Sequence, residues 1–159
     1  MSFHFRPAWP EDAPAILGLI RELAEYEHLL HESHADEAMV REALFCDVPR
    51  VFCEVAEAEG RIVGQAIWYY TFSTFAGRHG IYLEDLYVQP AFRGQGLGKE
   101  FLVRLAQRCV AENLARLDWQ VLDWNAPSIA FYESLGAKIL REWLPARVSG
   151  EALQRLAGK

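Results

Sequence analysis

Apolar residues in the first third of the chain recur with two different periods. Residues 3–7 alternate one by one, which predicts a short strand with one buried face. Over residues 10–30 the apolar positions recur every three to four residues, which predicts an amphipathic helix with acidic residues and prolines in its first turn. A second, shorter helix is predicted for residues 35–45.

The period then changes to that of strands. Residues 51–60 and 61–72 predict two strands joined by a tight turn at Gly60. Gly64, inside the second of these strands, predicts a bulge or a close approach of another backbone. A third apolar strand is predicted for residues 81–90, IYLEDLYVQP.

The last third of the chain alternates helices and strands. The pattern predicts a helix over 97–113, a strand over 116–122, a helix over 127–135, a strand over 137–143 and a short helix over 147–156. The predicted order is therefore β-α-α-β-β-β-α-β-α-β. With no repeat or linker in between, residues 1–159 are predicted to form one mixed α/β domain.

Composition and charge narrow the function classes. Of the 159 residues, 52% are hydrophobic and 24% are charged, which is typical of a globular domain. No apolar run approaches the roughly 18 residues of a membrane span, and the N-terminus lacks the apolar core of a signal peptide, so we expect a cytoplasmic protein. A net charge of −6 disfavours nonspecific binding to nucleic acid and suits a small cationic partner.

The cysteines and histidines suggest no metal site. Cys46, Cys53 and Cys109 are odd in number and widely spaced, which is neither a metal-binding pattern nor a disulfide framework. We interpret them as buried apolar thiols. The histidines form no helical metal pair with a supporting carboxylate, and we expect no metal.

The segment RGQGLGKE, residues 93–100, raises the question of which anion it holds. In a Walker A loop Gly94 would stand one residue further from Gly98, and Glu100 occupies the position of the magnesium-binding hydroxyl. In a dinucleotide-binding GxGxxG motif the third glycine would fall on Lys99. The spacing excludes both motifs.

What remains is the pattern R-x-x-G-x-G between a strand and a helix. Glycines let backbone amides approach a diphosphate closely, and the helix N-terminus adds about half a positive charge. The pattern therefore favours a pyrophosphate site that needs no magnesium. The alternative is a glycine-rich turn without a ligand.

This loop and its surroundings resemble the GNAT superfamily of acetyl-CoA-dependent N-acetyltransferases. The resemblance also rests on YLEDLYV at 82–88, on WNAPSIAFYESLGA at 124–137 and on the order of the elements. RELAEYE at 21–27 and NAPSIAFY at 125–132 resemble the diamine branch of that superfamily, with its spermidine/spermine and thialysine enzymes. The resemblance implies a mixed, mostly antiparallel twisted sheet flanked by helices, acetyl-CoA as the donor, and a homodimer.

Two residues are candidates for proton transfer. An amine with a pKa near 10.4 is neutral in only about one molecule in 2,500 at pH 7, so an acetyltransferase needs a route for its proton. Glu84 is our candidate for the base, acting directly or through water, and strand alternation predicts that Asp85 points to the opposite face. Tyr132 matches the family's general acid, which protonates the departing thiolate; alternatively its ring packs the helix against the sheet.

The resemblance also implies the residues that bind the donor. The strand backbone before the loop would pair with the pantetheine arm as an added strand does, and a backbone amide there can stabilise the oxyanion. The implied cofactor-binding residues are Leu86, Tyr87, Val88, Arg93, Gly94, Gln95, Gly96, Leu97, Gly98, Lys99, Asn125, Ser128 and Tyr132.

Acceptor binding is predicted at two further places. Tyr26 and Glu27 match polyamine-contacting positions of the branch, and acidic and aromatic groups suit a cationic amine. Asp118, Trp119 and Gln120 lie on a predicted strand that could line the same cleft. The predicted substrate-binding residues are Tyr26, Glu27, Glu84, Asp85, Asp118, Trp119 and Gln120. Beyond Glu27, the segment HLLHESH replaces the more acidic stretch of the spermidine/spermine enzymes, which favours a shorter diamine, a lysine analogue or another small amine.

These observations lead to one main hypothesis and two alternatives. We expect an enzyme that transfers acetyl from acetyl-CoA to a primary amine of a small cationic molecule by direct attack. The alternatives are a CoA-binding sensing module without turnover and a protein N-acetyltransferase.

Overall fold

The computed structural model describes residues 2–159, which divide into two compact units. The first ends at Gln120 and holds the sheet; the second is Val121–Lys159. Each unit is described by itself below. The prediction that residues 1–159 form one domain stays a prediction.

The first unit is built on a five-stranded sheet in the order β1-β2-β3-β4-β5. Its strands are β1 (His4–Pro7), β2 (Phe52–Ala58), β3 (Arg61–Ser73), β4 (Arg78–Val88) and β5 (Leu117–Trp119). The first three neighbouring pairs are antiparallel, and only β4 and β5 run parallel. The prediction of a mixed, mostly antiparallel α/β fold is confirmed.

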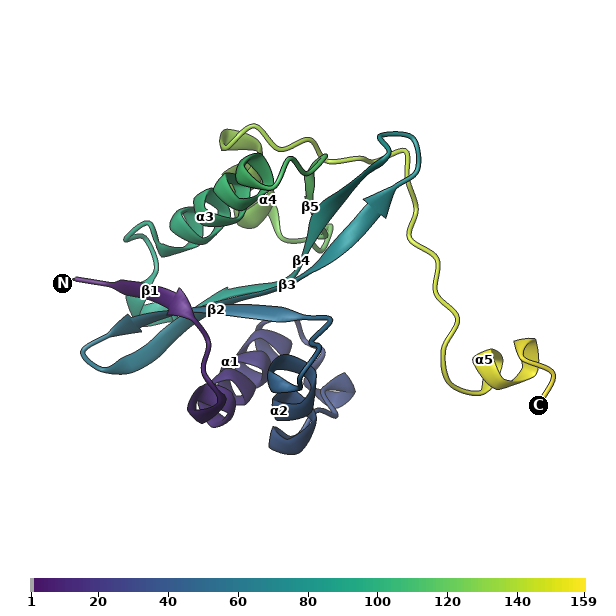
Figure 1. Cartoon of the computed structure of the whole chain (residues 1–159), viewed down its shortest axis with the longest axis horizontal. Helices are drawn as coiled ribbons and strands as arrows, with labels where there is room; N and C mark the ends of the chain where they lie inside the picture. The colour runs from purple at the N-terminus through teal and green to yellow at the C-terminus, as the bar shows by residue number, and fades with distance from the viewer. Residues whose placement is uncertain (1) are drawn as a thin grey trace. The chain divides into compact units, whose positions relative to one another are not determined.

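Helices cover the two faces of this sheet (Figure 1). They are α1 (Ala13–Tyr26), α2 (Glu37–Phe45) and α3 (Leu97–Ala111), with 3-10 turns η1 (Pro10–Asp12), η2 (Leu30–Glu32) and η3 (Pro90–Phe92). The apolar stripe of α1 packs with α2 on one face, where Ile16 and Val55 are fully buried and Ile67 nearly so. On the other face α3 packs through Phe101 and Leu105, both at most 1% exposed.

The predicted turn and the predicted irregularity in β3 are both present. Glu59 and Gly60 have φ values of 51° and 75°, the left-handed pair that a two-residue hairpin turn requires. Opposite Gly64 the β2–β3 register shifts between Ala56 and Glu57, which marks a bulge. A side chain at Gly64 would approach the carbonyl oxygen of Tyr87 to 3.2 Å. Both alternatives offered for this glycine are therefore confirmed.

The second unit contains two helices, α4 (Ala126–Ser134) and α5 (Gly150–Leu156). Asn125 caps α4, because its side-chain oxygen accepts from the Ser128 amide at 3.3 Å. Gly136, at φ 93°, ends the helix, as its amide bonds back to the Glu133 carbonyl.

The predicted strand over 137–143 is wrong. The backbone there closes on itself in turns: the Arg141 amide donates to the Ile139 carbonyl at 3.0 Å, and the Trp143 amide to the Leu140 carbonyl at 3.2 Å. Alternating apolar residues form a strand only where another strand takes up the backbone hydrogen bonds. Within the described residues this segment has no such neighbour.

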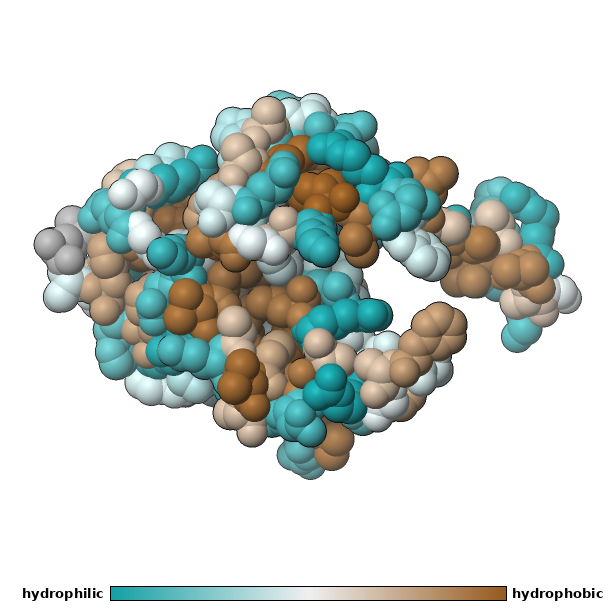
Figure 2. Space-filling model, turned by 90° about the horizontal axis from the view of Figure 1, so that it is seen from above, coloured by the Kyte–Doolittle hydropathy of each residue, from teal (hydrophilic) through white to brown (hydrophobic). Residues whose placement is uncertain are grey.

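Several large apolar side chains remain exposed, among them Phe72, Phe75, Val110, Trp143 and Leu144. On the face seen in Figure 2 the apolar residues are intermixed with polar ones. Scattered exposure of this kind is normal for globular proteins and does not by itself indicate a docking surface.

Alanine substitutions at two glycines, Gly80 in β4 and Gly18 in α1, test the close packing of β4 against the segment that enters β5. A side chain on Gly80 would lie 2.8 Å from the Arg116 carbonyl oxygen, which accepts from the Ile81 amide, and 3.0 Å from the Thr71 hydroxyl. We expect Gly80→Ala to lower the free energy of unfolding by about 2 kcal/mol in urea titrations, because backbone must move. Gly18→Ala, in α1 with nothing within 4 Å, is the matched control. It should raise stability by about 0.5–1 kcal/mol; equal effects of the two changes would contradict the close contact.

Candidate active site

A bulge in β4 organises the candidate site. Leu83 pairs with Trp68, whereas Asp85 pairs with Ile67, so Glu84 is an extra residue in β4. Paired residues point to the same face, and Ile67 and Trp68 point to opposite faces. Leu83 and Asp85 therefore also lie on opposite faces, and the regular alternation is lost at Glu84.

Electrostatic effects show which face carries Glu84. The charge of Glu84 contributes to raised pKa values at Asp85 and Glu27. It also contributes at Tyr69 and Tyr82, whose stacked rings lie 5.2 Å apart on the face of Ile67. Glu84 therefore shares a face with Asp85. The prediction that the two carboxylates point to opposite faces is wrong, because the bulge shifts the alternation by one residue.

We call Glu27, Tyr69, Tyr82, Glu84 and Asp85 the acidic–aromatic cluster. It lies on the face of the sheet covered by α1, at the end of that helix. Burial, followed by the charges of Glu84 and Glu27, raises the pKa of Asp85 to about 6. Burial and then the charge of Glu84 also raise the pKa of Glu27. Because the charges of Glu84 and Glu27 add to the raised pKa of Asp85, a cation beside these carboxylates would relieve their repulsion.

The two tyrosines complete the walls of the cluster. Burial raises the pKa of Tyr82 to about 12, with further contributions from Glu84, Tyr69 and Asp118. Both phenols are therefore neutral at physiological pH. Their ring faces can contact the alkyl part or the charged end of an amine.

Only some of the predicted substrate residues on and after β5 point to the face of the cluster. Asp118 pairs with Tyr82 and so points to the cluster side, where its carboxylate accepts from Arg116 Nε at 2.8 Å. Trp119 pairs with Leu83 and therefore points to the face covered by α3. Gln120 follows the end of β5 and is exposed. Of these three predicted substrate residues, the structure brings Asp118 to the cluster and places Trp119 on the other face.

Beyond the bulge, β4 separates from β5. The parallel pairing covers Ile81 to Leu83 only, whereas pairing with β3 continues through Leu86, Tyr87 and Val88. Within the described residues no strand therefore pairs with that edge of β4 after Leu83. An extended ligand chain can add to such an edge through backbone hydrogen bonds.

The glycine-rich loop follows this edge directly. Gly94 and Gly96 have φ values of 74° and 87°, conformations that side chains rarely adopt. The first intrahelical bond of α3 joins the Glu100 amide to the Gly96 carbonyl at 2.9 Å. The amides of Leu97, Gly98 and Lys99 thus have no acceptor within the helix, and the exposed loop can direct them to a diphosphate.

Three predicted residues lie in the second unit, on and before α4. Asn125 is 7% exposed and holds the first turn of the helix through Ser128. Tyr132 lies on the same helix, with its ring 5.4 Å from that of Phe131.

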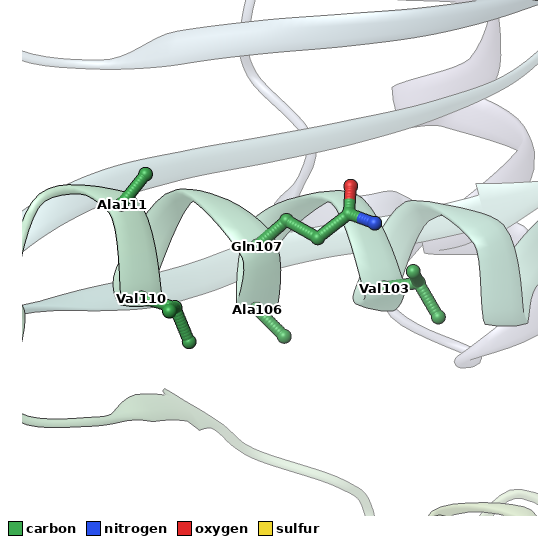
Figure 3. A pocket seen from close by; sticks show the side chains of 5 residues that line it. All are labelled: Val103, Ala106, Gln107, Val110 and Ala111. Atoms are coloured by element: carbon green, nitrogen blue, oxygen red, sulfur yellow. The ribbon is translucent and has the colours of Figure 1, made fainter.

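An apolar hollow on α3 is a different feature. It has a volume of about 420 Å³ and is lined by Val103, Ala106, Gln107, Val110 and Ala111. Figure 3 shows Val103, Ala106 and Val110 pointing to the same side of the helix. No titratable side chain lines it, so it offers no group for proton transfer.

The described residues 2–159 contain no group of three or more potential metal-ligating side chains. None of the helices in this range combines the length and apolar content that a bilayer crossing requires.

The sequence matches a known family over most of its length. The pattern described as "Acetyltransferase (GNAT) family" matches residues 17–137. The chain belongs to this GNAT acetyltransferase family. Three similar curated proteins, covered over nearly their full length, are named thialysine N-epsilon-acetyltransferase. Together with the family match, this makes the chain an N-acetyltransferase.

Individual relatives refine the picture of this GNAT chain. It is 41% identical over 165 residues to the thialysine N-epsilon-acetyltransferase of Bos taurus, covering 97% of this chain and 96% of the relative. It is 37% identical over 142 residues to the human spermidine/spermine N(1)-acetyltransferase-like protein 1, covering 85% of this chain and 20% of that protein. The solved structure of an integron cassette protein from the mobile metagenome of V. cholerae has a TM-score of 0.83 at 26% identity, covering 100% and 99% of the two chains.

The raised pKa of Asp85 predicts how the free energy of unfolding changes with pH. Its pKa is about 6 in the folded protein against an ordinary value of 3.8, so ionising Asp85 costs stability as pH rises from about 4 to about 6. We expect Asp85→Asn to gain stability relative to the wild type over that interval, by on the order of 2 kcal/mol in urea titrations at pH 4 and pH 7. In a Glu84→Gln background the gain should shrink, because one source of repulsion is gone. A gain independent of pH would contradict the cluster.

Proposed function

We propose that this N-acetyltransferase moves the acetyl group of acetyl-CoA to a primary amine of a small cationic acceptor, by direct attack in a ternary complex. The observation that carries the proposal is the acidic–aromatic cluster, gathered by the β4 bulge beside the strand edge that leads to the glycine-rich loop. Relatives named thialysine N-epsilon-acetyltransferase, 38% and 41% identical, support a lysine-like acceptor.

We propose that the donor is bound mainly through backbone groups. The pyrophosphate lies in the loop Arg93–Lys99, where amides at the start of α3 are directed outward. The pantetheine arm adds to the β4 edge at Leu86–Val88, and an amide there stabilises the oxyanion. Asn125 and Ser128 are further donor-binding residues in the second unit.

The acceptor is held by opposite charge. The distal ammonium of the amine is attracted to Glu27 and Asp85, and Tyr26 with Asp118 extends the binding surface. Gln120, at the end of β5, is a further proposed substrate residue. Trp119, predicted for the same role, points to the face covered by α3 and is not part of this surface. Because three carboxyl groups already repel one another in the free protein, a cationic ligand is favoured over a neutral one.

Proton transfers complete the reaction. Glu84 takes the proton of the attacking ammonium, directly or through water, so that the neutral amine attacks the thioester carbonyl. The tetrahedral intermediate then expels the CoA thiolate. Tyr132 donates a proton to that thiolate, for which a phenol is suited, and is reprotonated, directly or through water, by the second proton that the attacking nitrogen loses.

We also propose that the chain acts as a single domain, as a homodimer and in the cytoplasm. The dimer rests on the family resemblance of RELAEYE, YLEDLYV and NAPSIAFY to the diamine branch.

A thiol-release screen tests the proposed reaction. Acetyl-CoA is offered with thialysine, lysine, diamines, polyamines, other amino acids and peptides, and we expect turnover on short amines with a second positive charge. 1,3-Diaminopropane and propylamine form a matched pair that differs only in the distal ammonium. The diamine should have a kcat/KM higher by about 10- to 100-fold, the range of one or two charge-assisted contacts.

Two results of the screen would replace the proposal. No turnover on any amine, with CoA still bound, would make the protein a sensing module. Turnover on proteins alone, detected as acetylation by mass spectrometry, would make it a protein N-acetyltransferase. Equal kcat/KM values for propylamine and the diamine would contradict the role of the acidic–aromatic cluster.

The acid role of Tyr132 has its own test. We expect Tyr132→Phe to lower kcat by about 100-fold, the usual contribution of a general acid, with CoA affinity nearly unchanged. Tyr70→Phe removes another phenol, which donates to Glu112 at 2.6 Å, and is the matched control. It should leave kcat as in the wild type. An unchanged kcat in Tyr132→Phe would remove this residue from the mechanism.

A further inference from the structure

Arg93 opens the glycine-rich loop, but its side chain is engaged elsewhere. Its Nε donates to the Val88 carbonyl at 2.8 Å. Its guanidinium carbon lies 5.2 Å from the centre of the Tyr26 ring and 5.3 Å from that of Tyr87. The guanidinium therefore contacts one ring from the last residue of α1 and one from β4, at distances where cation–π attraction operates.

A second contact joins the same two elements one helical turn earlier. Glu22 of α1 accepts from Gln89 Nε2 at 3.0 Å, just past the end of β4. Burial raises the pKa of Tyr87, and the charge of Glu22 and a hydrogen bond to it raise the pKa further. Two successive turns of α1 thus contact the corner where β4 enters the loop, one through Glu22 and the other through Tyr26.

This corner lies between the two proposed substrates. Tyr26 and Glu27, at the end of α1, belong to the acceptor side, and the loop from Arg93 onward belongs to the donor side. The helix end is strained locally, because His28 has a φ of 62°. The contact between Arg93 and Tyr26 restrains this end relative to the loop.

We propose that Arg93 is a positioning residue that fixes the end of α1 against the donor loop and thereby sets the affinity for the amine, while backbone amides hold the pyrophosphate. This inference rests on the proposed function. Arginine suits the task better than lysine, because its planar group can contact two rings while Nε donates to a carbonyl.

The experiment compares Arg93→Lys and Arg93→Gln with the wild type. We expect both variants to raise the KM for the best amine of the screen by about 5- to 10-fold, because neither side chain can contact both rings while donating to the Val88 carbonyl. The Kd for CoA, measured by calorimetry, should rise less than the amine KM does, because the backbone amides that hold the pyrophosphate are retained in both variants. Arg104→Lys is the matched control: Arg104 also contacts a ring, that of Phe5 at 5.7 Å, and donates through Nε to Glu54, but on the face covered by α3.

A different pattern would overturn the inference. If Arg93 were instead a phosphate ligand, Arg93→Gln would weaken CoA binding at least tenfold, and Arg93→Lys would retain it. The amine KM would then be that of the wild type in both variants. An amine KM equal to that of the wild type in both variants would also contradict positioning by Arg93, even with the proposed reaction established.

Hydrogen exchange separates this inference from the proposed reaction. Three amides at the end of α1 report on its order: Glu27 bonds to Leu23, His28 to Glu25 and Leu29 to Ala24. They should exchange about 5- to 10-fold faster in Arg93→Lys than in the wild type, and at the wild-type rate in Arg104→Lys. Unchanged exchange would refute the positioning role even if the wild type acetylated no amine. Faster exchange without turnover would retain the positioning role and reject the reaction.

Discussion

The one-residue slip between β3 and β4 is the constraint on which the candidate site depends. Glu84 and Asp85 together oppose Ile67, so the alternation of β4 changes phase there. Two adjacent carboxylates then share the face covered by α1, with Glu27 and the stacked pair Tyr69 and Tyr82. A regular strand would place one carboxylate in contact with α3 and separate its charge from the others.

The same region also ends the pairing of β4 with β5. Because β5 pairs only with Ile81, Tyr82 and Leu83, the following residues keep one backbone edge for a ligand. The chain then turns through the left-handed glycines Gly94 and Gly96 into α3. Acidic side chains, strand edge and helix N-terminus thus follow one another within 16 residues of chain, from Tyr82 to Leu97. Attraction of a cation and binding of a diphosphate are served by different atoms, carboxylates for the first and amides for the second.

Local patterns in the sequence determined most of the fold. The apolar period of α1 and α3 and the tight turn at Gly60 depend on neighbours within a few residues, and each appears as predicted. The segment 137–143 has the composition of a strand and does not form one, because a strand is completed by a partner that local sequence does not specify. For the site, the sequence identified Glu27, Glu84 and Asp85 as candidates, whereas Tyr69 and Tyr82 join them only through the pairing of β3 with β4.

What the sequence determined by itself is the chemistry at hand: a glycine-rich turn before a helix, an acidic pair in a strand, and the family to which the chain belongs. Only the tertiary structure decided how those groups face one another. The register of β3 against β4 places Glu84 beside Asp85, and the approach of α1 brings Tyr26 to Arg93 at the start of the loop. Both depend on contacts between residues far apart in the chain. The relative direction of two side chains in a sheet follows from pairing, and pairing is set by the packing of whole elements rather than by any short stretch of sequence.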